Sequence, residues 1–219
     1  MDDDTIPTQS ALEELILAKE ALQSENISFL CSKVIGLNGE EMNLPTISRR
    51  TDETNYPIWM KHLDKSIIEV EDATFVSLLI NVDAINKLGL PWKEFFIWGD
   101  DTEYTMRLTS MYGPAYVVGK SIVVHKRFGP SNLSIVDETN VNRIAMYRYQ
   151  FRNGLINASE YFGNKIVFKS GEKAGSTKID FITTEKGLAK DSVIVNVYDY
   201  KIYSGSAGSN TNISKIDLT

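Results

Sequence analysis

The sequence predicts an α/β domain in which a mixed sheet is flanked by helices, followed by a C-terminal extension. Three observations favour this fold class. Residues 11–24 have the apolar spacing of an amphipathic helix, and the apolar runs 27–35 and 75–82 are typical of buried strands. A second helical pattern follows the aspartates at 100 and 101. A chain of 219 residues is long enough to bury a core around such a sheet.

The first part of the chain predicts a helix, a strand and a loop. An apolar stripe runs along residues 11–24 through Leu12, Leu15, Ile16 and Leu22. Ser10 and Glu13 form a capping-box pattern at the start of this helix. The run 27–35 then predicts a buried strand, and the polar, irregular segment 46–64 favours a loop or a short helix.

The middle of the chain continues the alternation of strand and helix. The run 75–82 predicts a strand covered on both faces, and 83–88 predicts a short helix that Gly89 and Pro91 end. A helix over 100–111 begins at the aspartate pair. Two short strands are expected at 116–118 and 122–125, on either side of a glycine and a lysine.

The pattern changes after residue 163. Apolar residues and arginines recur at helical spacing over 138–155, whereas valines alternate over 193–197 as in a strand. The Gly/Ser/Asn/Thr stretch 204–212 is typical of a flexible tail. These changes predict a domain over 1–163 and an extension over 164–219.

Composition and charge exclude several classes of protein. The chain has 23 Lys and Arg against 29 Asp and Glu, so its formal net charge of -6 disfavours nucleic acid as the main partner. One cysteine and two histidines cannot form an internal disulfide or a structural zinc site, which fits a reducing compartment. The acidic N-terminus does not resemble a signal peptide, and no apolar run approaches the roughly 20 residues of a spanning helix.

Two acidic segments and one histidine are the main candidates for chemistry. Consecutive aspartates at 2–4 are typical of a solvated surface, but alternate carboxylates on an extended backbone can also hold a divalent cation. Asp100, Asp101 and Glu103 can cap a helix, whose dipole would keep the pKa of Asp101 from rising strongly. Aromatic residues that include Trp98 precede these acids, which favours a sugar platform beside a base.

His125 and the arginines of the 138–155 helix each have a structural and a functional interpretation. A lone histidine at a strand end is usually a packing residue, and it becomes a metal ligand only if carboxylates meet it. Arg143, Arg148 and Arg152 are typical of a solvated helix face, with phosphate binding as the alternative.

In this order, the motifs resemble a family 2 glycosyltransferase of the GT-A fold, similar to galactofuranosyl- and rhamnosyltransferase-like members. The resemblance covers about the first three quarters of the chain, which would form part of the GT-A (Rossmann-like) fold. It includes the acidic triplet, the acidic segment after Trp98, His125 after a short strand, and an aromatic and arginine-rich helix. In this family a nucleotide-binding half precedes the triplet, so the resemblance implies a truncated chain that lacks this half, and the sequence does not determine whether the chain is active alone.

The resemblance implies an enzyme, a hexosyltransferase that inverts the anomeric carbon of a nucleotide-diphosphate sugar. Asp2, Asp4 and His125 would bind Mn²⁺ or Mg²⁺. Asp101 would be the general base, and Asp100 would orient the acceptor or the base. The substrate-binding residues would be Trp98, Asp3, Glu103, Arg148 and Arg152, with bracing of the helix as the favoured role of the two arginines.

The resemblance also implies partners and a location. A UDP- or dTDP-linked donor would supply the sugar to a glycan or lipid-linked acceptor in cell-surface polysaccharide synthesis. The chain would work in the cytoplasm, at the inner face of the membrane to which it could attach peripherally. One rival is a non-catalytic carbohydrate-binding or interaction module that lacks donor binding. A nucleotidyltransferase is disfavoured, because the sequence has no glycine-rich phosphate loop.

Overall fold

The structure, a computed structural model, describes residues 1–22, 26–127, 135, 138–161, 175–181 and 191–197. The chain divides into two compact units, each built from two separate segments. The first unit contains Met1–Trp92 and Asp100–Asn132, and the second contains Lys93–Gly99 and Leu133–Thr219. The sequence-based boundary after residue 163 lies inside the second unit. Among the described residues, no helix is both long and apolar enough to cross a membrane.

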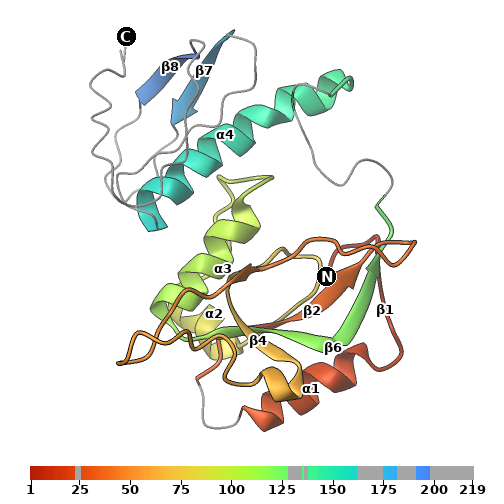
Figure 1. Ribbon diagram of the computed structural model, residues 1–219. Helices are drawn as coiled ribbons and strands as arrows, with labels where there is room; N and C mark the ends of the chain where they lie inside the picture. The colour runs from red at the N-terminus through yellow and green to blue at the C-terminus, as the bar shows by residue number, and fades with distance from the viewer. Residues whose placement is uncertain (23–25, 128–134, 136–137, 162–174, 182–190, 198–219) are drawn as a thin grey trace. The chain divides into compact units, whose positions relative to one another are not determined.

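The first unit is an α/β fold with a mixed, curled sheet of six strands flanked by helices (Figure 1). Five strands have the order β3-β4-β6-β2-β5, and β1 also pairs with β6. β2 runs parallel to β6, and the other pairs are antiparallel. This arrangement is compatible with a Rossmann-like fold. The strands are β1 (Thr5–Pro7), β2 (Phe29–Ile35), β3 (Thr46–Ile47), β4 (Ile67–Asp72), β5 (Leu78–Ile80) and β6 (Ala115–His125).

Helices cover both faces of this sheet. α1 (Ala11–Ala21) packs on one face and α3 (Asp100–Met111) on the other (Figure 1). Alternate residues of β2 face the two helices, so that Phe29 joins the cluster with α3 and Leu30 joins the cluster with α1. The short helix α2 (Val82–Leu88) begins at Asn81, whose side chain caps it, and ends at Gly89 with φ +81°.

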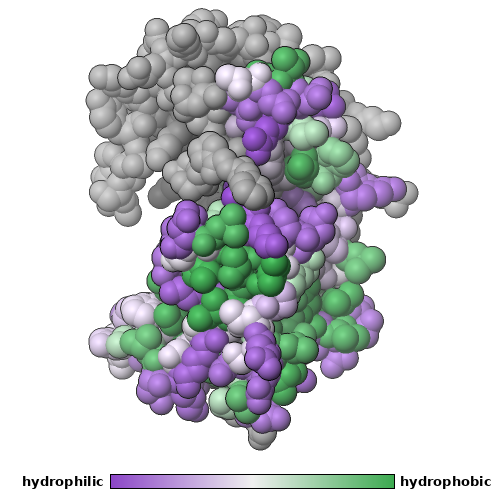
Figure 2. Space-filling model, turned by 90° about the vertical axis from the view of Figure 1, so that its right-hand side faces the viewer, coloured by the Kyte–Doolittle hydropathy of each residue, from purple (hydrophilic) through white to green (hydrophobic). Residues whose placement is uncertain are grey.

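The apolar stripe of α1 differs from the expected one. The face that packs on the sheet contains Ala11, Leu15, Ala18 and Leu22, whereas Leu12 is 64% exposed and Ile16 is 42% exposed. Small alanines allow the helix to approach the sheet on that face. The expected capping box is absent, because the Ser10 side chain makes no capping hydrogen bond. Figure 2 shows hydrophobic side chains gathered in patches on the surface, between hydrophilic ones.

Two short strands were expected where the structure has the single strand β6. β2 follows β6 from Ala115 to Val124, but the register shifts after Ser32, and three residues of β6 form a bulge. Ser121 stabilises the bulge, since its buried hydroxyl contacts the Ser32 hydroxyl at 2.8 Å and donates to the Ala11 carbonyl at 2.7 Å. The glycine and lysine that indicated a turn therefore lie in a β-bulge.

β4 and the extent of β5 were not predicted from the sequence. β4 lies between β3 and β6, and it begins just after a short 3₁₀ helix, η1 (Leu63–Lys65). The expected strand over 75–82 is reduced to the half-buried β5, because β5 lies at the sheet edge and pairs with β2 alone.

The second unit contains α4 (Val141–Tyr161) and the antiparallel strands β7 (Gly175–Phe181) and β8 (Asp191–Val197). The helix expected over 138–155 is confirmed and extends further, and the strand expected over 193–197 is confirmed as part of β8. The stretch 204–212 lies outside the described residues.

Candidate metal and catalytic site

The three aspartates at positions 2–4 belong to a turn that backbone hydrogen bonds hold at both ends. The Asp2 amide donates to the Val76 carbonyl at 3.3 Å, and the Thr5 amide donates to the Asp2 carbonyl at 3.2 Å. The Asp4 carbonyl accepts from the Lys126 amide at 2.9 Å. The aspartates therefore precede β1 in a turn, whereas the cation-site interpretation of the sequence assumed an extended backbone.

The pairing of β1 with β6 brings this turn to His125. Thr5 lies opposite His125 in the ladder, and Nε2 of His125 lies 3.2 Å from Oδ1 of Asp4. Nδ1 of His125 lies 2.8 Å from Oδ1 of Asn43. An amide oxygen accepts hydrogen bonds, so Nδ1 can donate to Asn43, while Nε2 faces the Asp4 carboxylate. Asn43 thus holds one edge of the imidazole, and the Nε2 edge faces the aspartate turn.

The donor set of this turn fits a divalent cation. Ligand atoms of Asp2, Asp4 and His125 all lie within 4.8 Å of one another. Two carboxylates and one imidazole nitrogen are ligand types that suit Mn²⁺, and the carboxylates also suit Mg²⁺. Asn43 supplies the outer hydrogen bond that usually orients a metal-binding imidazole. Asp3 is exposed and lies outside this group.

Asp100 and Asp101 begin α3 and lie in the same unit as the aspartate turn. The Thr102 amide donates to Oδ1 of Asp101 at 2.8 Å, and the Thr105 hydroxyl donates to the Asp101 carbonyl at 2.7 Å. Burial raises the pKa of Asp100, and the negative charge of Asp2 raises that pKa further. The start of α3 is therefore close enough to the aspartate turn for the charges to interact.

The pKa of Asp101 is raised from its ordinary 3.8 to about 6. Burial is the largest cause, the Thr102 amide opposes it, and the charges of Asp100 and Asp72 add to it. The sequence-based expectation that the helix dipole would prevent a strong rise is wrong. Removal of the carboxylate from water costs more than the backbone amides at the helix start restore.

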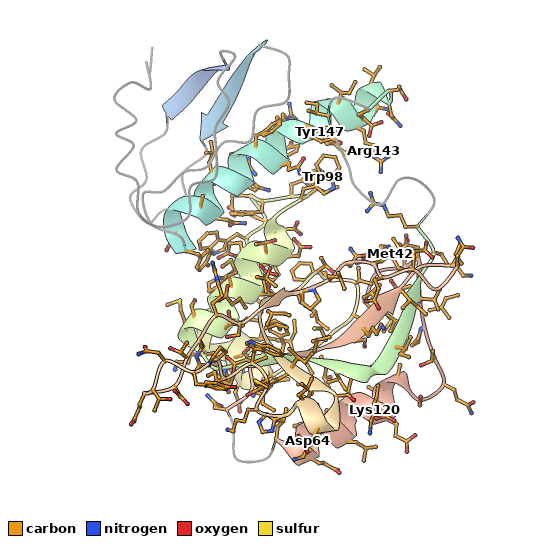
Figure 3. The ribbon with its side chains drawn as sticks, viewed as in Figure 1. Met42, Asp64, Trp98, Lys120, Arg143 and Tyr147 are labelled. Atoms are coloured by element: carbon orange, nitrogen blue, oxygen red, sulfur yellow. The ribbon has the colours of Figure 1, made fainter. Side chains whose placement is uncertain are left out.

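Trp98 belongs to the second unit, where the segment 93–99 packs on α4. The rings of Trp98 and Tyr147 lie with their centroids 4.9 Å apart and their planes tilted by 54° (Figure 3). Trp98 is half-buried and Tyr147 is buried. The structure thus presents one indole on a helix surface, which is compatible with a sugar platform.

Asn153 of α4 holds this aromatic segment in an uncommon backbone conformation. Phe96 and Trp98 have φ values of +59° and +58°, a region that residues with a side chain rarely adopt. The Asn153 amide donates to the carbonyls of Phe95, Ile97 and Trp98 at 2.9, 3.1 and 2.8 Å. These bonds offset the backbone strain on both sides of Ile97.

Arg148 and Arg152 of α4 brace their own surroundings. Arg152 is 7% exposed, and it donates to the Glu94 carbonyl and to Oδ1 of Asn153. Burial lowers its pKa. Arg148 is exposed and donates to the Tyr149 hydroxyl at 2.9 Å. These contacts agree with bracing as the favoured interpretation, and contact with phosphate stays a prediction.

Glu103 is more buried than expected for the substrate-binding role that the resemblance implies. Its side chain is 1% exposed and forms an ion pair with Arg107, one turn along α3, at 2.9 Å. Arg107 also donates to the carbonyls of Leu88 and Leu90. The pair therefore joins α3 to the loop after α2, and the interior position of the carboxylate gives Glu103 a structural role.

Comparisons with known proteins assign no family to this chain. No protein-family model matches the sequence, and no curated protein matches it either. The functional argument therefore depends on the geometry of the described residues.

Sequence reasoning missed the residues that orient the candidate site. Asn43 lies in a loop and has a φ of +47°. Asparagine tolerates this conformation better than most residues, and this preference is the only local clue to its position. Asn153 and Arg107 lie on predicted helices, but their partners are carbonyls of distant segments. No local pattern identifies such contacts.

Proposed function

We propose that the chain belongs to a metal-dependent, inverting glycosyltransferase of the GT-A fold. It would transfer a sugar from a nucleotide-diphosphate donor to a hydroxyl of a glycan or lipid-linked acceptor, as in cell-surface polysaccharide synthesis. The observation that carries the proposal is the convergence of Asp2, Asp4 and His125 within 4.8 Å, near the acidic start of α3.

The metal ligands in this proposal are Asp2, Asp4 and His125. When bound there, Mn²⁺ or Mg²⁺ supplies positive charge that offsets the charge of a leaving nucleoside diphosphate. The two carboxylates carry the opposite charge that attracts the cation, and Asn43 orients the His125 ring through its contact with Nδ1. Formation of this site needs the pairing of β1 with β6.

Asp101 is the proposed general base for the acceptor hydroxyl. With its pKa raised to about 6, Asp101 is mostly ionised at pH 7 and binds a proton more strongly than an ordinary aspartate. Its amide partner, Thr102, fixes one carboxylate oxygen and leaves the other to accept a proton. Asp100, with a raised pKa of its own, is placed to orient the acceptor or the base.

Thermal unfolding with Mn²⁺ and with UDP or dTDP, added separately and together, tests this proposal. A ligand at 100 times its Kd should add about 2.7 kcal/mol to the free energy of unfolding. We expect a metal-dependent shift that the double variant Asp4→Asn, His125→Ala loses and that the matched pair His62→Ala, Asp64→Asn keeps. No shift with any combination, or a shift that the first variant retains, would contradict the site and favour a non-catalytic module.

Replacement of Asn43 with glycine should weaken Mn²⁺ binding by about 10- to 100-fold, because His125 loses the acceptor that orients it. Glycine tolerates the φ of +47°, so the backbone is not strained. Titration calorimetry with Mn²⁺ measures the effect. Asn55→Gly is the control, since Asn55 has a similar φ of +62° and lies far from His125 in the fold. Equal affinities for the two variants would exclude the role of Asn43.

A further inference from the structure

A second candidate site lies in the first unit, at the end of the sheet away from the aspartate turn. A hollow of about 730 Å³ opens between the loop that contains Tyr56 and Met60, the buried Glu69 of β4 and the start of β6 at Tyr116. This volume lies in the range of small-molecule sites, about 300–1,000 Å³. In Figure 1 the loop lies on the side of the sheet opposite to the N-terminus.

The hollow is separate from the candidate metal site. Tyr116 lines the hollow and pairs with Leu30, while Val124, beside His125, pairs with Ile35. Leu30 and Ile35 lie five residues apart along β2, which corresponds to about 17 Å along the strand. One small ligand therefore cannot occupy both sites.

An ion pair between the exposed Arg50 and the buried Glu69 forms the polar wall of the hollow. Glu69 is 5% exposed, and its Oε1 accepts from the Ser48 hydroxyl at 2.9 Å and from Nη1 of Arg50 at 3.0 Å. Both of these donors use Oε1, and none of the hydrogen bonds between described residues uses Oε2, which can accept from a ligand donor. The Arg50 side chain is 59% exposed, which leaves other N–H groups of its guanidinium accessible. The wall therefore offers an acceptor and donors side by side.

A rigid turn presents an aromatic ring at the rim. Oδ1 of Asp52 accepts from the amides of Thr54 and Tyr56 at 2.8 and 3.0 Å and from the Thr54 hydroxyl at 2.6 Å. The Asp52 amide donates to the Tyr56 carbonyl at 2.9 Å, which closes the turn. Tyr56 is 60% exposed on this turn. An exposed ring on a fixed turn is available to a ligand at little cost in conformational entropy.

Charge balance in the hollow decides the ligand class. Among the described residues that line it, Arg50 and Lys61 are basic and Asp52 and Glu69 are acidic, so neither sign of charge predominates there. Such a site does not favour a phosphate or another polyanion. A sugar is neutral, its ring faces pack on apolar side chains, and its hydroxyls need acceptors and donors together. We propose that this hollow binds a neutral oligosaccharide.

NMR titration of the whole chain tests the proposal, with neutral tetrasaccharides of glucose, galactose, mannose and rhamnose and with tetragalacturonate as the acidic counterpart. EDTA is present and nucleotide is absent, so the outcome is independent of the proposed transfer reaction. We expect at least one neutral tetrasaccharide to bind saturably. Tyr56→Ala and Glu69→Gln should each raise its Kd at least tenfold.

The neighbouring pair Arg49 and Glu71 provides matched controls, because it lies outside the hollow. Glu71→Gln and Arg49→Ala should change the Kd by less than twofold. The exposed position of Tyr56 means that Tyr56→Ala folds, which a melting curve verifies. Three outcomes would overturn the proposal: no saturable binding of any neutral tetrasaccharide, binding of tetragalacturonate alone, or binding that both Tyr56→Ala and Glu69→Gln leave unchanged.

Discussion

In a longer enzyme chain that includes the donor-binding half, replacement of Asp101 with asparagine is expected to slow the proposed sugar transfer by roughly 10²- to 10⁴-fold, because the variant has no group to accept the proton of the acceptor hydroxyl. Asparagine has nearly the same shape, and its carbonyl oxygen can still accept from the Thr102 amide. The loss should therefore appear in kcat without a loss of folded structure. A transfer rate close to that of the unchanged chain would exclude Asp101 as the base.

The same variant should be more stable at neutral pH. The pKa of Asp101 is about 6 in the folded chain against an ordinary 3.8, so the folded state binds the proton more tightly than the unfolded state. The buried carboxylate then destabilises the fold above pH 6, and this cost disappears as the pH falls from 6 towards 4. Asparagine removes the cost, with a gain of up to about 3 kcal/mol at pH 7.

Urea unfolding at pH 7 and at pH 4 measures this gain. The difference in unfolding free energy between the variant and the unchanged chain should be large at pH 7 and small at pH 4. Asp83→Asn is the matched control, because Asp83 is an exposed aspartate in the first turn of α2. It should alter neither transfer nor the pH dependence. Equal stability of the two chains at both pH values would contradict the burial of an ionised Asp101.

Replacement of Arg107 with methionine is expected to lower the free energy of unfolding by about 3–5 kcal/mol. The change would leave the Glu103 carboxylate, 1% exposed, without the guanidinium that contacts both its oxygens at 2.9 Å. It would also remove the donors to the Leu88 and Leu90 carbonyls and the cation over the Trp92 ring. Urea unfolding at pH 7 measures the loss.

A double variant distinguishes the contribution of the ion pair to the free energy of unfolding from the contribution of side-chain packing. Glu103→Met with Arg107→Met should recover most of the loss, because apolar residues of similar volume replace a buried pair at little cost. Arg49→Met is the surface control: Arg49 is 68% exposed in its pair with Glu71, and its loss should be about 1 kcal/mol or less. A loss for Arg107→Met as small as that of Arg49→Met would mean that the buried pair does not hold the loop.

The helices were predictable from the sequence because their signals are local. α2 is bounded by Asn81 and Gly89, and α3 begins at the expected aspartates, since caps and helical spacing involve residues within a few positions. The strands were less predictable. β4 was missed, and β6 was expected as two strands, because its bulge depends on Ser32 and Ala11, which lie about ninety and more positions away.

The sequence by itself determined which side chains could do chemistry. These are the aspartates at 2–4, the acids that begin α3, the aromatic residues just before those acids, and His125. Only the tertiary structure decided how these groups behave. It brings Asp2 and Asp4 to His125 through the pairing of β1 with β6, and it fixes the imidazole with Asn43. It also raises the pKa of Asp101 and buries Glu103 against Arg107. The physical reason is that desolvation and hydrogen bonds between distant segments depend on neighbours in space, which no local pattern of residues specifies.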